Sequence, residues 1–373
     1  MTQRRKVMCL CQTYYQLIVC VQMRKTVLKD DEVTLVLTDS SNNMEVIAGR
    51  IEAENIFDRV FFAAGTREKT QEFSAAKNKL YRFFQYFFPG KLTSFLPKDH
   101  YDLLLTYNLN WYTFMLFTAL CRYNSDIGVC QFEEGLISYS VDPRAFDMPY
   151  FGKIWRIKRL LKQQIIFDRI DRFYCFFPEL YHGQFTAVQI PKIQSEDAGM
   201  RDLYIRLFDI DQQKVVYRQK YVYFASMIDS ELDGSSNGEL ELVRRIADIV
   251  GKENLLVKMH PRENQPSRFI DLGIAVDTNS NIPFEILQLV HDFSANVFIT
   301  AMSGAVINMA PVLTDMPQIY FLHRLLGAQT ATIRRNGDMF EKLINQLNQI
   351  LKDDKIAVVT DDKDLQRKLQ RGR

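Results

Sequence analysis

Short apolar runs alternate with longer stretches of helical spacing along the first half of the chain. The run at 7–11 is typical of a buried strand, and the stretch that follows carries Leu17, Ile18 and Val21 at helical spacing. Further strands are predicted at 33–37, 59–62, 101–105, 127–132 and 171–177, and further helices at 44–53, 69–88 and 111–122. Because strands that alternate with helices build a parallel sheet covered on both faces, the pattern predicts a Rossmann-like α/β domain.

The same alternation resumes after a mixed, polar stretch in the middle of the chain. Strands are predicted at 221–226, 254–259, 274–276, 295–300, 318–322 and 358–360, with helices at 239–250, 305–313 and 339–351, one that opens at Pro283 and a short one at the C-terminus. The predicted organisation is a Rossmann-like domain at 1–183, a crossover at 184–219 with a helical segment at 200–208, and a second Rossmann-like domain at 220–373. Two such α/β domains facing each other across a cleft form the GT-B plan.

Composition narrows the class of protein. With 373 residues, 47% of them hydrophobic, the chain can bury a core in each domain and is not disordered. A net charge of +2 and the lack of a recognition motif give no reason to expect nucleic-acid binding. The six cysteines lie mostly in apolar runs without paired metal spacing, which predicts reduced, buried thiols and a cytoplasmic protein. No apolar span of 18 residues occurs, so no transmembrane helix is predicted.

Two stretches, 77–98 and 151–169, combine aromatic and basic residues. The second is predicted as an amphipathic helix with a cationic face, which carries Lys153, Arg156, Lys158, Arg159 and Lys162. Such a helix lies on an anionic membrane surface, here the inner face of the membrane, or packs on a partner. The alternative is a helix packed on its own domain with its basic face in solvent, and the pattern leaves both open.

The strand predicted at 127–132 leads into Glu133-Glu134-Gly135. A carboxylate at a strand end can act as a general base that takes the proton of an attacking hydroxyl. A second carboxylate beside it raises the pKa of the first toward the working range. The alternative interpretation is a solvated acidic turn.

The strand at 254–259 ends in a polar cluster that contains Lys258 and His260-Pro261. In open α/β sheets, ligands bind just beyond the carboxyl ends of the strands, where a histidine is well placed to meet a phosphate. The alternative is a strand end with solvated charges. Ser226, at the end of another strand, is a further candidate by position alone.

The segment Thr300-Ala301-Met302-Ser303-Gly304 is predicted as a strand-to-helix turn. The Ser303 hydroxyl and backbone N–H groups at the helix start could bind a phosphate without a metal, and Gly304 lets the backbone approach a ligand. The more frequent role of such a serine is that of a helix N-cap, and the two roles are compatible.

Together these motifs resemble the bacterial sialyltransferases of GT-B type, which carry an acidic-acidic-Gly, a His-Pro and a Ser-rich motif in that order. Glu133-Glu134-Gly135, His260-Pro261 and Ser303 follow that order here. Pro283-Phe284-Glu285 lies where those families place a glutamate for the cytidine ribose. The opening segment Cys11-Gln12-Thr13-Tyr14-Tyr15-Gln16-Leu17 is similar to the start of the lipooligosaccharide sialyltransferases, glycosyltransferase family 52.

The resemblance implies an inverting, metal-independent transfer of sialic acid from CMP-sialic acid to a galactose-type acceptor of a cell-surface lipooligosaccharide or polysaccharide. Glu133 would be the base, and His260 would stabilise or protonate the departing phosphate. The predicted nucleotide site in the C-terminal domain comprises Ser226, Lys258, His260, Pro261, Glu285, Ser303 and Gly304, with Ser303 on the phosphate and Glu285 on the ribose. The resemblance also implies a homodimer and no cofactor beyond the donor substrate.

The sequence departs from the family pattern in the acidic motif and at Gly304. An aspartate often holds the base position in relatives, and a second hydroxyl often stands where Gly304 is found. The base can also lie elsewhere in relatives, so Glu134, Asp229 and Asp233 stay candidates. The alternatives are a GT-B transferase that uses another sugar nucleotide in capsule or exopolysaccharide synthesis, and a non-catalytic GT-B-like partner in glycan assembly.

Overall fold

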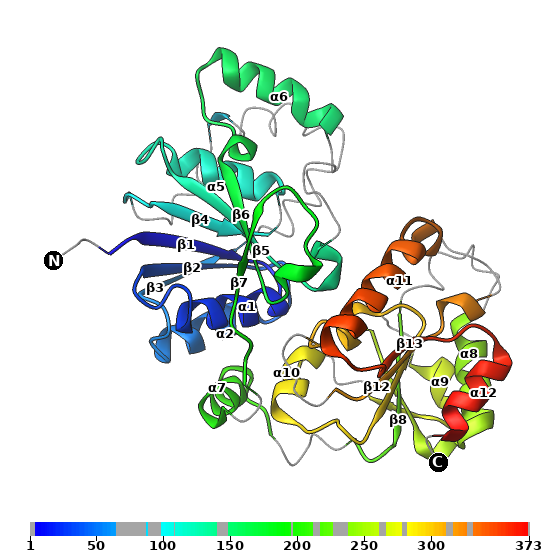
Figure 1. The fold of residues 1–373 in the computed structure, drawn as a ribbon. Helices are drawn as coiled ribbons and strands as arrows, with labels where there is room; N and C mark the ends of the chain where they lie inside the picture. Colours follow the sequence, from blue (N-terminus) through cyan, green and yellow to red (C-terminus); the bar gives the residue numbers. More distant parts are fainter. Residues whose placement is uncertain are drawn as a thin grey trace. The chain divides into compact units, whose positions relative to one another are not determined.

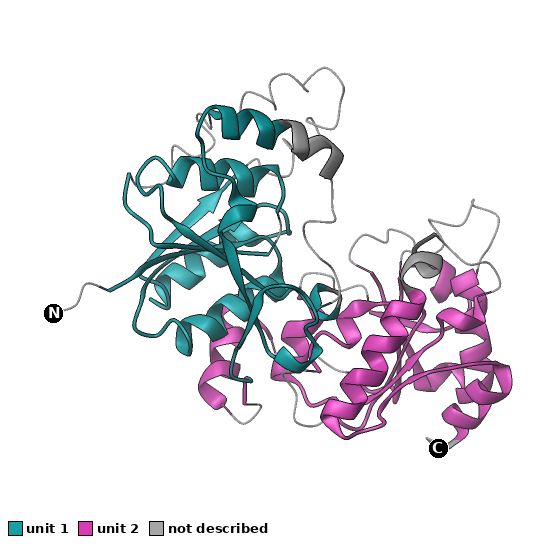
Figure 2. Ribbon diagram, turned by 45° about the horizontal axis from the view of Figure 1, so that its top comes forward, with its two compact units in different colours: residues 1–192 teal, residues 193–373 magenta. Residues whose placement is uncertain are grey.

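The computed structural model describes residues 4–64, 87–88, 98–107, 109–139, 148–194, 197–211, 217–226, 238–260, 266–277, 282–310, 316–326 and 331–371, with the side chains of 137, 148–153, 331–336 and 371 outside this description. The chain divides into two compact units, Met1–Lys192 and Ile193–Arg373, which Figure 2 shows in different colours. Each unit is described by itself below.

Unit 1 is built on a sheet of seven parallel strands in the order β3-β2-β1-β4-β5-β6-β7 (Figure 1). The strands are β1 (Lys6–Cys11), β2 (Glu32–Thr38), β3 (Arg59–Ala63), β4 (Leu103–Thr106), β5 (Gly128–Phe132), β6 (Ile170–Cys175) and β7 (Thr186–Gln189). The central strands read as continuous apolar runs because helices bury both faces of the sheet. Strands β2 and β3 follow β1 on one side of the sheet, whereas β4 to β7 lie on its other side. The strand order therefore switches between β1 and β4, and sheets of this kind bind ligands at such a switch point.

Helices flank this sheet. They are α1 (Tyr14–Lys25), α2 (Met44–Ala53), α5 (Trp111–Leu120) and α6 (Met148–Leu160), with 3-10 turns η3 (Leu136–Tyr139), η5 (Ile166–Arg169) and η6 (Pro178–Leu180). Helix α1 begins directly after β1 because Thr13 caps it, accepting a hydrogen bond from the Gln16 N–H at 3.2 Å. Asn110 caps α5 in the same way, through the Thr113 N–H at 3.1 Å. Both caps start a helix at the carboxyl edge of the sheet.

Unit 2 repeats this plan with six parallel strands in the order β10-β9-β8-β11-β12-β13. The strands are β8 (Tyr221–Phe224), β9 (Leu255–Lys258), β10 (Ala275–Asp277), β11 (Val297–Thr300), β12 (Gln318–Phe321) and β13 (Ile356–Val358). Its helices are α7 (Ala198–Phe208), α8 (Gly238–Val250), α9 (Ser267–Ile270), α10 (Phe284–Val290), α11 (Ala331–Leu351) and α12 (Asp362–Arg371), with 3-10 turns η9 (Lys252–Asn254), η10 (Gly304–Val306) and η11 (His323–Leu325). The switch point of this sheet lies between β8 and β11.

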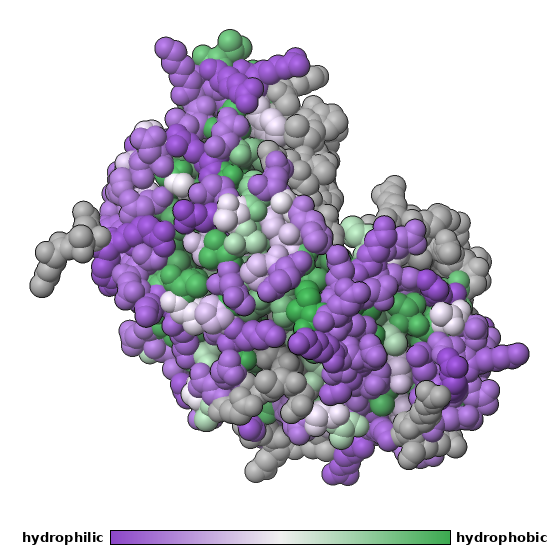
Figure 3. Space-filling view, viewed as in Figure 1, coloured by the Kyte–Doolittle hydropathy of each residue, from purple (hydrophilic) through white to green (hydrophobic). Residues whose placement is uncertain are grey.

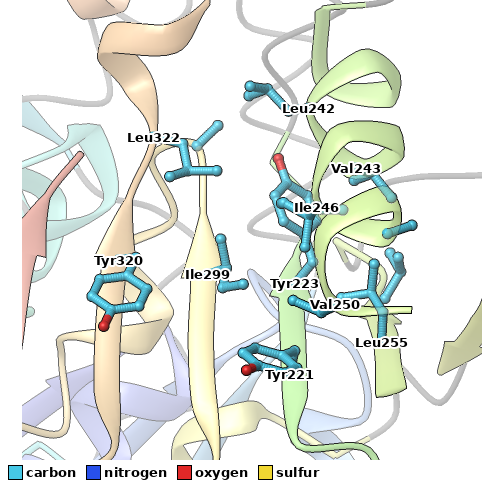
Figure 4. Close-up of a cluster of buried hydrophobic side chains, with 14 of the residues drawn as sticks. Tyr221, Tyr223, Leu242, Val243, Ile246, Val250, Leu255, Ile299, Tyr320 and Leu322 are labelled. Atoms are coloured by element: carbon cyan, nitrogen blue, oxygen red, sulfur yellow. The ribbon is translucent and has the colours of Figure 1, made fainter. Parts of the chain in front are cut away.

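One face of the unit 2 sheet packs on α8. Tyr223 of β8 lies beside Ile246 of α8, with Ile299 of β11 on its other side (Figure 4). The apolar residues of α8 recur at 242, 243, 246, 247 and 250, so one stripe of the helix is buried. This packing fixes the first turn of α8 against the carboxyl end of β8.

The predicted fold class, two Rossmann-like α/β domains as in GT-B proteins, is confirmed. One helix prediction is wrong: within 305–313 the described chain forms the three-residue turn η10 and then irregular turns up to 310. The predicted crossover at 184–219 contains β7, which pairs with β6, and helix α7. Strand β7 is half-exposed and only four residues long, so its sequence lacks a clear apolar run. Of the helix predicted at 69–88, only 87 and 88 lie within the described residues.

The basic stretch at 151–169 spans the end of α6 and the turn η5 (Figure 1). Ile154 is buried in the unit 1 core, and the Trp155 ring lies 4.6 Å from that of Phe167. Lys158 is buried as well and donates to Thr118 Oγ1 at 2.8 Å, and burial lowers its pKa to about 8. The apolar side of α6 therefore packs on its own domain, which is the second of the two alternatives; membrane association stays a prediction.

The surface of the molecule is mostly polar on the face seen in Figure 3, including the region over α6. Leu160 at the end of α6 is an exception, with 81% of its surface exposed. No described helix is both long and apolar enough to span a membrane.

Candidate active site

Three turns lie side by side at the carboxyl edge of the unit 1 sheet, after β1, β4 and β5. The Gln131 side chain donates from Nε2 to the Tyr107 carbonyl at 3.0 Å and so joins the ends of β5 and β4. The Asn110 side chain donates to Gln12 Oε1 at 3.0 Å and joins the turn after β4 to the turn after β1. The acidic motif predicted from the sequence stands at this edge, immediately after β5.

Glu133 is fully buried in this edge, with 0% of its surface exposed. Its carboxylate accepts hydrogen bonds from the hydroxyls of Tyr15 and Tyr139 and, at 2.8 Å, from the backbone N–H of Phe176. Burial raises the pKa of Glu133, and these three donors act in the opposite direction by stabilising the charged form. Glu133 thus ties α1, η3 and the turn after β6 together at one carboxylate.

Glu134 stands next to it in a different environment. It is half-buried, and burial raises its pKa to about 7, with the side chains of Thr13 and Gln16 acting in the opposite direction. Its N–H donates to Ser138 Oγ at 3.2 Å. Gly135, which follows, has a φ of 81°, a left-handed conformation that glycine adopts without strain. The two neighbouring carboxylates of the Glu-Glu-Gly sequence therefore lie in different surroundings: that of Glu133 is fully buried, and that of Glu134 is half-buried.

Gln16 adds a polar group to the same place. Its Oε1 accepts from the Gln12 N–H at 2.7 Å, and its side chain stabilises the charged form of Glu134. Gln16 therefore links the turn after β1 to the second carboxylate of the acidic motif.

Three further turns meet at the switch point of unit 2. Phe224 of β8 is in register with Lys258 of β9 on one side and with Thr300 of β11 on the other. His260 and Ser226 each stand two residues beyond their strands, and Ser303 stands three beyond. The structure therefore brings together His260, Ser226 and Ser303, three candidates that are far apart in the sequence.

The turn after β11 presents the Ser303 side chain. Thr300 Oγ1 donates to the Phe224 carbonyl at 3.0 Å and accepts from the Ser303 N–H at 2.9 Å, which fixes the turn against β8. Ser303 occupies the N-cap position of η10, but its side chain makes no cap hydrogen bond. Gly304 is partly exposed, and a Cβ placed on it would meet only Asn308 Oδ1, at 3.8 Å. The Ser303 hydroxyl is therefore available to a ligand.

Lys258 has a structural partner. Its side chain is buried, and its Nζ lies 3.0 Å from Asp277 Oδ2 at the end of β10. Tyr217 donates to the same Asp277 oxygen at 2.6 Å. This pair joins β9 to β10 directly before His260, so Lys258 supports the turn that carries the histidine. A role in nucleotide binding stays a prediction.

Glu285 stands in the first turn of α10, beside η10. Asn308 donates to its Oε1 at 3.4 Å, and Gln288 of the same helix donates to the Ala305 carbonyl at 3.4 Å. Burial raises the pKa of Glu285. These contacts place Glu285 next to the turn that presents Ser303, and its role at a ribose stays a prediction.

The sequence reasoning missed Glu239, in the first turn of α8. Its carboxylate has 0% exposure and accepts from the Ser226 N–H at 2.7 Å, the Ser226 hydroxyl at 2.8 Å and the Tyr223 hydroxyl at 3.0 Å. Arg268 lies 3.3 Å from its other oxygen, and burial raises the pKa of Glu239 to about 7. In the sequence it looks like any acidic residue at a helix start, where such residues are common.

The remaining candidates, Pro261, Asp229 and Asp233, lie outside the described residues. All six cysteines are unpaired, and five of them are buried, as predicted. Within the ranges that the structure describes, no group of three or more His, Cys, Asp or Glu side chains could hold a metal ion.

A protein-family model described as Alpha-2,8-polysialyltransferase (POLYST) matches residues 8–323. The chain belongs to this family. The match includes the acidic motif at 133–135 and the serine motif at 303, and it extends over both units. Membership makes this polysialyltransferase-family protein an enzyme, a glycosyltransferase of sialyltransferase type, and the predicted resemblance is confirmed at that level.

Solved structures similar to this family member share little sequence with it. UDP-N-acetylglucosamine 2-epimerase from Rickettsia bellii is 16% identical with a TM-score of 0.46, and the match covers 99% of this chain and 96% of the epimerase. Glycosyltransferase SsfS6 from Streptomyces sp. SF2575 is 10% identical with a TM-score of 0.44, covering 99% and 100%. The fold assignment of this chain therefore rests on the order of its two parallel sheets. No curated protein sequence matches the chain.

Proposed function

We propose that this protein transfers sialic acid from CMP-sialic acid to a glycan acceptor, with inversion and without a metal ion. The observation that carries the proposal is the meeting of His260, Ser226 and Ser303 at the switch point of unit 2, in a chain of the polysialyltransferase family. Ligands of open α/β sheets bind at that point. The donor is therefore assigned to unit 2.

On the donor side, the reaction breaks the bond between the anomeric carbon and the phosphate oxygen, so negative charge grows on the departing CMP. The Ser303 hydroxyl, which makes no cap bond, donates to the phosphate. His260 stabilises or protonates the leaving oxygen, a role that a preorganised polar group performs without reorganising in the reaction. Glu285 accepts from the ribose hydroxyls, which carry protons to donate.

On the acceptor side, a hydroxyl attacks the anomeric carbon and gives up its proton. We assign that proton to the Glu133–Glu134 pair. Glu133 holds the position that the resemblance gives to the base, while Glu134 is partly exposed and has a pKa of about 7, which suits a base at neutral pH. Comparison of the rates of Glu133→Gln and Glu134→Gln identifies the proton acceptor.

The family description supports one of the two acceptors over the other. An alpha-2,8-polysialyltransferase adds sialic acid to a chain of sialic acid, so an acceptor that already ends in sialic acid is favoured over a galactose-type end of a lipooligosaccharide. Repeated transfer to such an end would build a polymer. An oligosialic acid and a galactose-terminated oligosaccharide, each with the same fluorescent label, separate the two acceptors.

A donor screen tests the proposal. The full-length protein is incubated with CMP-sialic acid, UDP-sugars or GDP-sugars and labelled acceptor, and the released nucleotide is separated by chromatography. The expected result is CMP release that depends on the acceptor. Release of UDP or GDP instead would replace the donor assignment, and release of no nucleotide would favour a non-catalytic role in glycan assembly.

A further inference from the structure

Two serines stand at the switch point of unit 2 and differ in what their hydrogen-bonding groups do. Ser303 follows β11 and gives its N–H to Thr300 Oγ1, while its hydroxyl makes no cap bond. Ser226 follows β8 and gives both its N–H and its hydroxyl to one oxygen of Glu239. The two strands are neighbours in register, so both serines follow adjacent strand ends at the carboxyl edge of the sheet.

The Glu239 carboxylate that holds Ser226 is itself fixed. Besides the two bonds from Ser226, at 2.7 and 2.8 Å, the same Oε1 accepts from the Tyr223 hydroxyl at 3.0 Å. Tyr223 is anchored in the unit 2 core between β8 and α8 (Figure 4). Arg268 lies 3.3 Å from Oε2. A buried carboxylate held by several donors keeps its position, because low-dielectric surroundings strengthen each bond.

This arrangement decides what Ser226 can offer a ligand. A serine has two donors, the backbone N–H and the hydroxyl proton, and its hydroxyl oxygen also has lone pairs that accept. Both donors point at Glu239, and Ser226, with 8% of its surface exposed, receives no hydrogen bond from any described residue. Only the lone pairs of Oγ are left. An ionised phosphate oxygen also only accepts, so the two groups do not pair.

We propose that Glu239 is a positioning residue that makes Ser226 a hydrogen-bond acceptor for a hydroxyl, amide or amino group of the sugar nucleotide. The phosphate is left to Ser303 and the turn after β11. This inference rests on the proposed function, because it takes a sugar nucleotide as the ligand of the switch point. The proposal gives the two turns different tasks. Ser226, after β8, accepts from a proton-bearing group of the donor, and Ser303, after β11, donates to its phosphate.

Binding measurements on the full-length protein test the division. Isothermal titration calorimetry with CMP-sialic acid, CMP and cytidine gives three dissociation constants for the wild type, Ser226→Ala and Ser303→Ala. The ratio of the cytidine constant to the CMP constant measures the contribution of the phosphate. Ser226→Ala is expected to weaken binding of CMP-sialic acid about three- to tenfold, as for loss of one neutral hydrogen bond, with the ratio unchanged. Ser303→Ala, the matched control, is expected to lower the ratio.

Two results would overturn the proposal. If Ser226→Ala lowers the ratio as Ser303→Ala does, Ser226 contacts the phosphate. If Ser226→Ala binds all three ligands as the wild type does, Ser226 contacts none of them. Ser226→Thr keeps the hydroxyl and is expected to restore binding, which a loss of packing alone would not predict.

The positioning role of Glu239 needs its own measurement. Glu239→Gln is expected to raise the KM for CMP-sialic acid about three- to tenfold while kcat stays within about twofold, because the ligand contact changes and the leaving-group chemistry does not. A fall in kcat at unchanged KM would contradict this role. Should this variant not fold, as judged by circular dichroism, the serine variants still decide the proposal.

Failure of the proposed function is distinguishable from failure of this inference. If the wild type binds neither CMP nor CMP-sialic acid, and the donor screen releases another nucleotide, the donor assignment is wrong. The same ratio, measured with that nucleotide and its nucleoside, then tests the division between Ser226 and Ser303.

Discussion

The two units use one sheet order twice, yet the carboxyl edges of their sheets differ in chemistry. At the edge of unit 1, the buried carboxylate of Glu133 is held by neutral donors, two tyrosine hydroxyls and one backbone N–H. At the edge of unit 2, Glu239 is held by Ser226, Tyr223 and a cation, Arg268, and the turns after β9 and β11 carry His260 and Ser303, which can donate to an anion. Burial raises the pKa of both carboxylates, and hydrogen-bond donors act in the opposite direction in each, with Arg268 as an additional cation beside Glu239 only. In the proposed reaction, the same fold provides a place that takes a proton in unit 1 and a place that holds a phosphate in unit 2.

The acidic pair gives the sharpest test of this difference. Glu133→Gln and Glu134→Gln keep the shape of each side chain and remove its ability to accept a proton. The variant that removes the proton acceptor is expected to lower kcat by about 10²–10⁴, the usual contribution of general base catalysis. Its partner variant is expected to lose less than about tenfold. Initial rates with CMP-sialic acid and saturating acceptor measure both variants. A loss of less than about tenfold in each would show that neither Glu133 nor Glu134 is the base.

His260 tests the other side of the comparison. His260→Ala removes a group that stabilises the departing phosphate, and such preorganised groups contribute about 10²–10³ in rate. The matched control is His100→Ala, an exposed histidine that precedes β4 and so lies at the amino edge of the unit 1 sheet. Near-full turnover in His260→Ala with CMP-sialic acid would refute the leaving-group role, whereas the control is expected to keep wild-type rates.

Lys258 separates a supporting residue from a ligand contact. Lys258→Met leaves the half-buried Asp277 without the buried cation that lies 3.0 Å away, and removal of one partner of a buried ion pair is strongly destabilising. We expect a loss of about 3 kcal/mol in the free energy of unfolding, measured by urea denaturation. The KM for donor in the folded fraction should change little. A large rise in KM at unchanged stability would instead make Lys258 a nucleotide contact, as the sequence suggested.

The pH dependence of the rate sharpens the assignment within the acidic pair. A base must be deprotonated to act, and the pKa of Glu134 is raised to about 7 by burial. If Glu134 is the base, kcat/KM rises about tenfold per unit as pH increases toward 7 and levels off above it, because the active, charged form then dominates. A pH–rate profile from 5 to 9 measures this. A profile that is already flat from pH 5 would exclude a base with that pKa.

Much of the fold could be predicted because the central strands are buried on both faces. The runs Val7–Cys11 and Val33–Leu37 contain almost no polar residue, so their place in a parallel sheet could be read directly from the sequence. Strand ends then located His260, Ser303 and the acidic pair, since parallel strands bring their carboxyl ends to one edge. Strand β7 escaped prediction because it carries no continuous apolar run, and η10 stands where a longer helix at 305–313 was predicted.

The rest of the candidate site depends on contacts that no local pattern records. Glu239 contacts Ser226 across 13 positions in the sequence, and Lys258 contacts Asp277 across 19. Glu239 comes from helix α8 and Asp277 from the end of the neighbouring strand β10, so each pairing exists only once these elements are assembled. Whether a polar residue at a strand end is open to a ligand or already engaged is therefore a property of the packed domain.

The smallest expected effect comes from removing metal ions. In the proposed reaction, the charge of the departing phosphate is met by the Ser303 hydroxyl and by His260 at the edge of unit 2, which is the role that a divalent cation plays in metal-dependent transferases. Addition of EDTA in excess is therefore expected to leave the initial rate with CMP-sialic acid unchanged. Loss of activity that added Mg²⁺ restores would mean that the cation, and not these side chains, neutralises the leaving group. The edge of unit 2 would then need a bound metal ion to neutralise the departing phosphate.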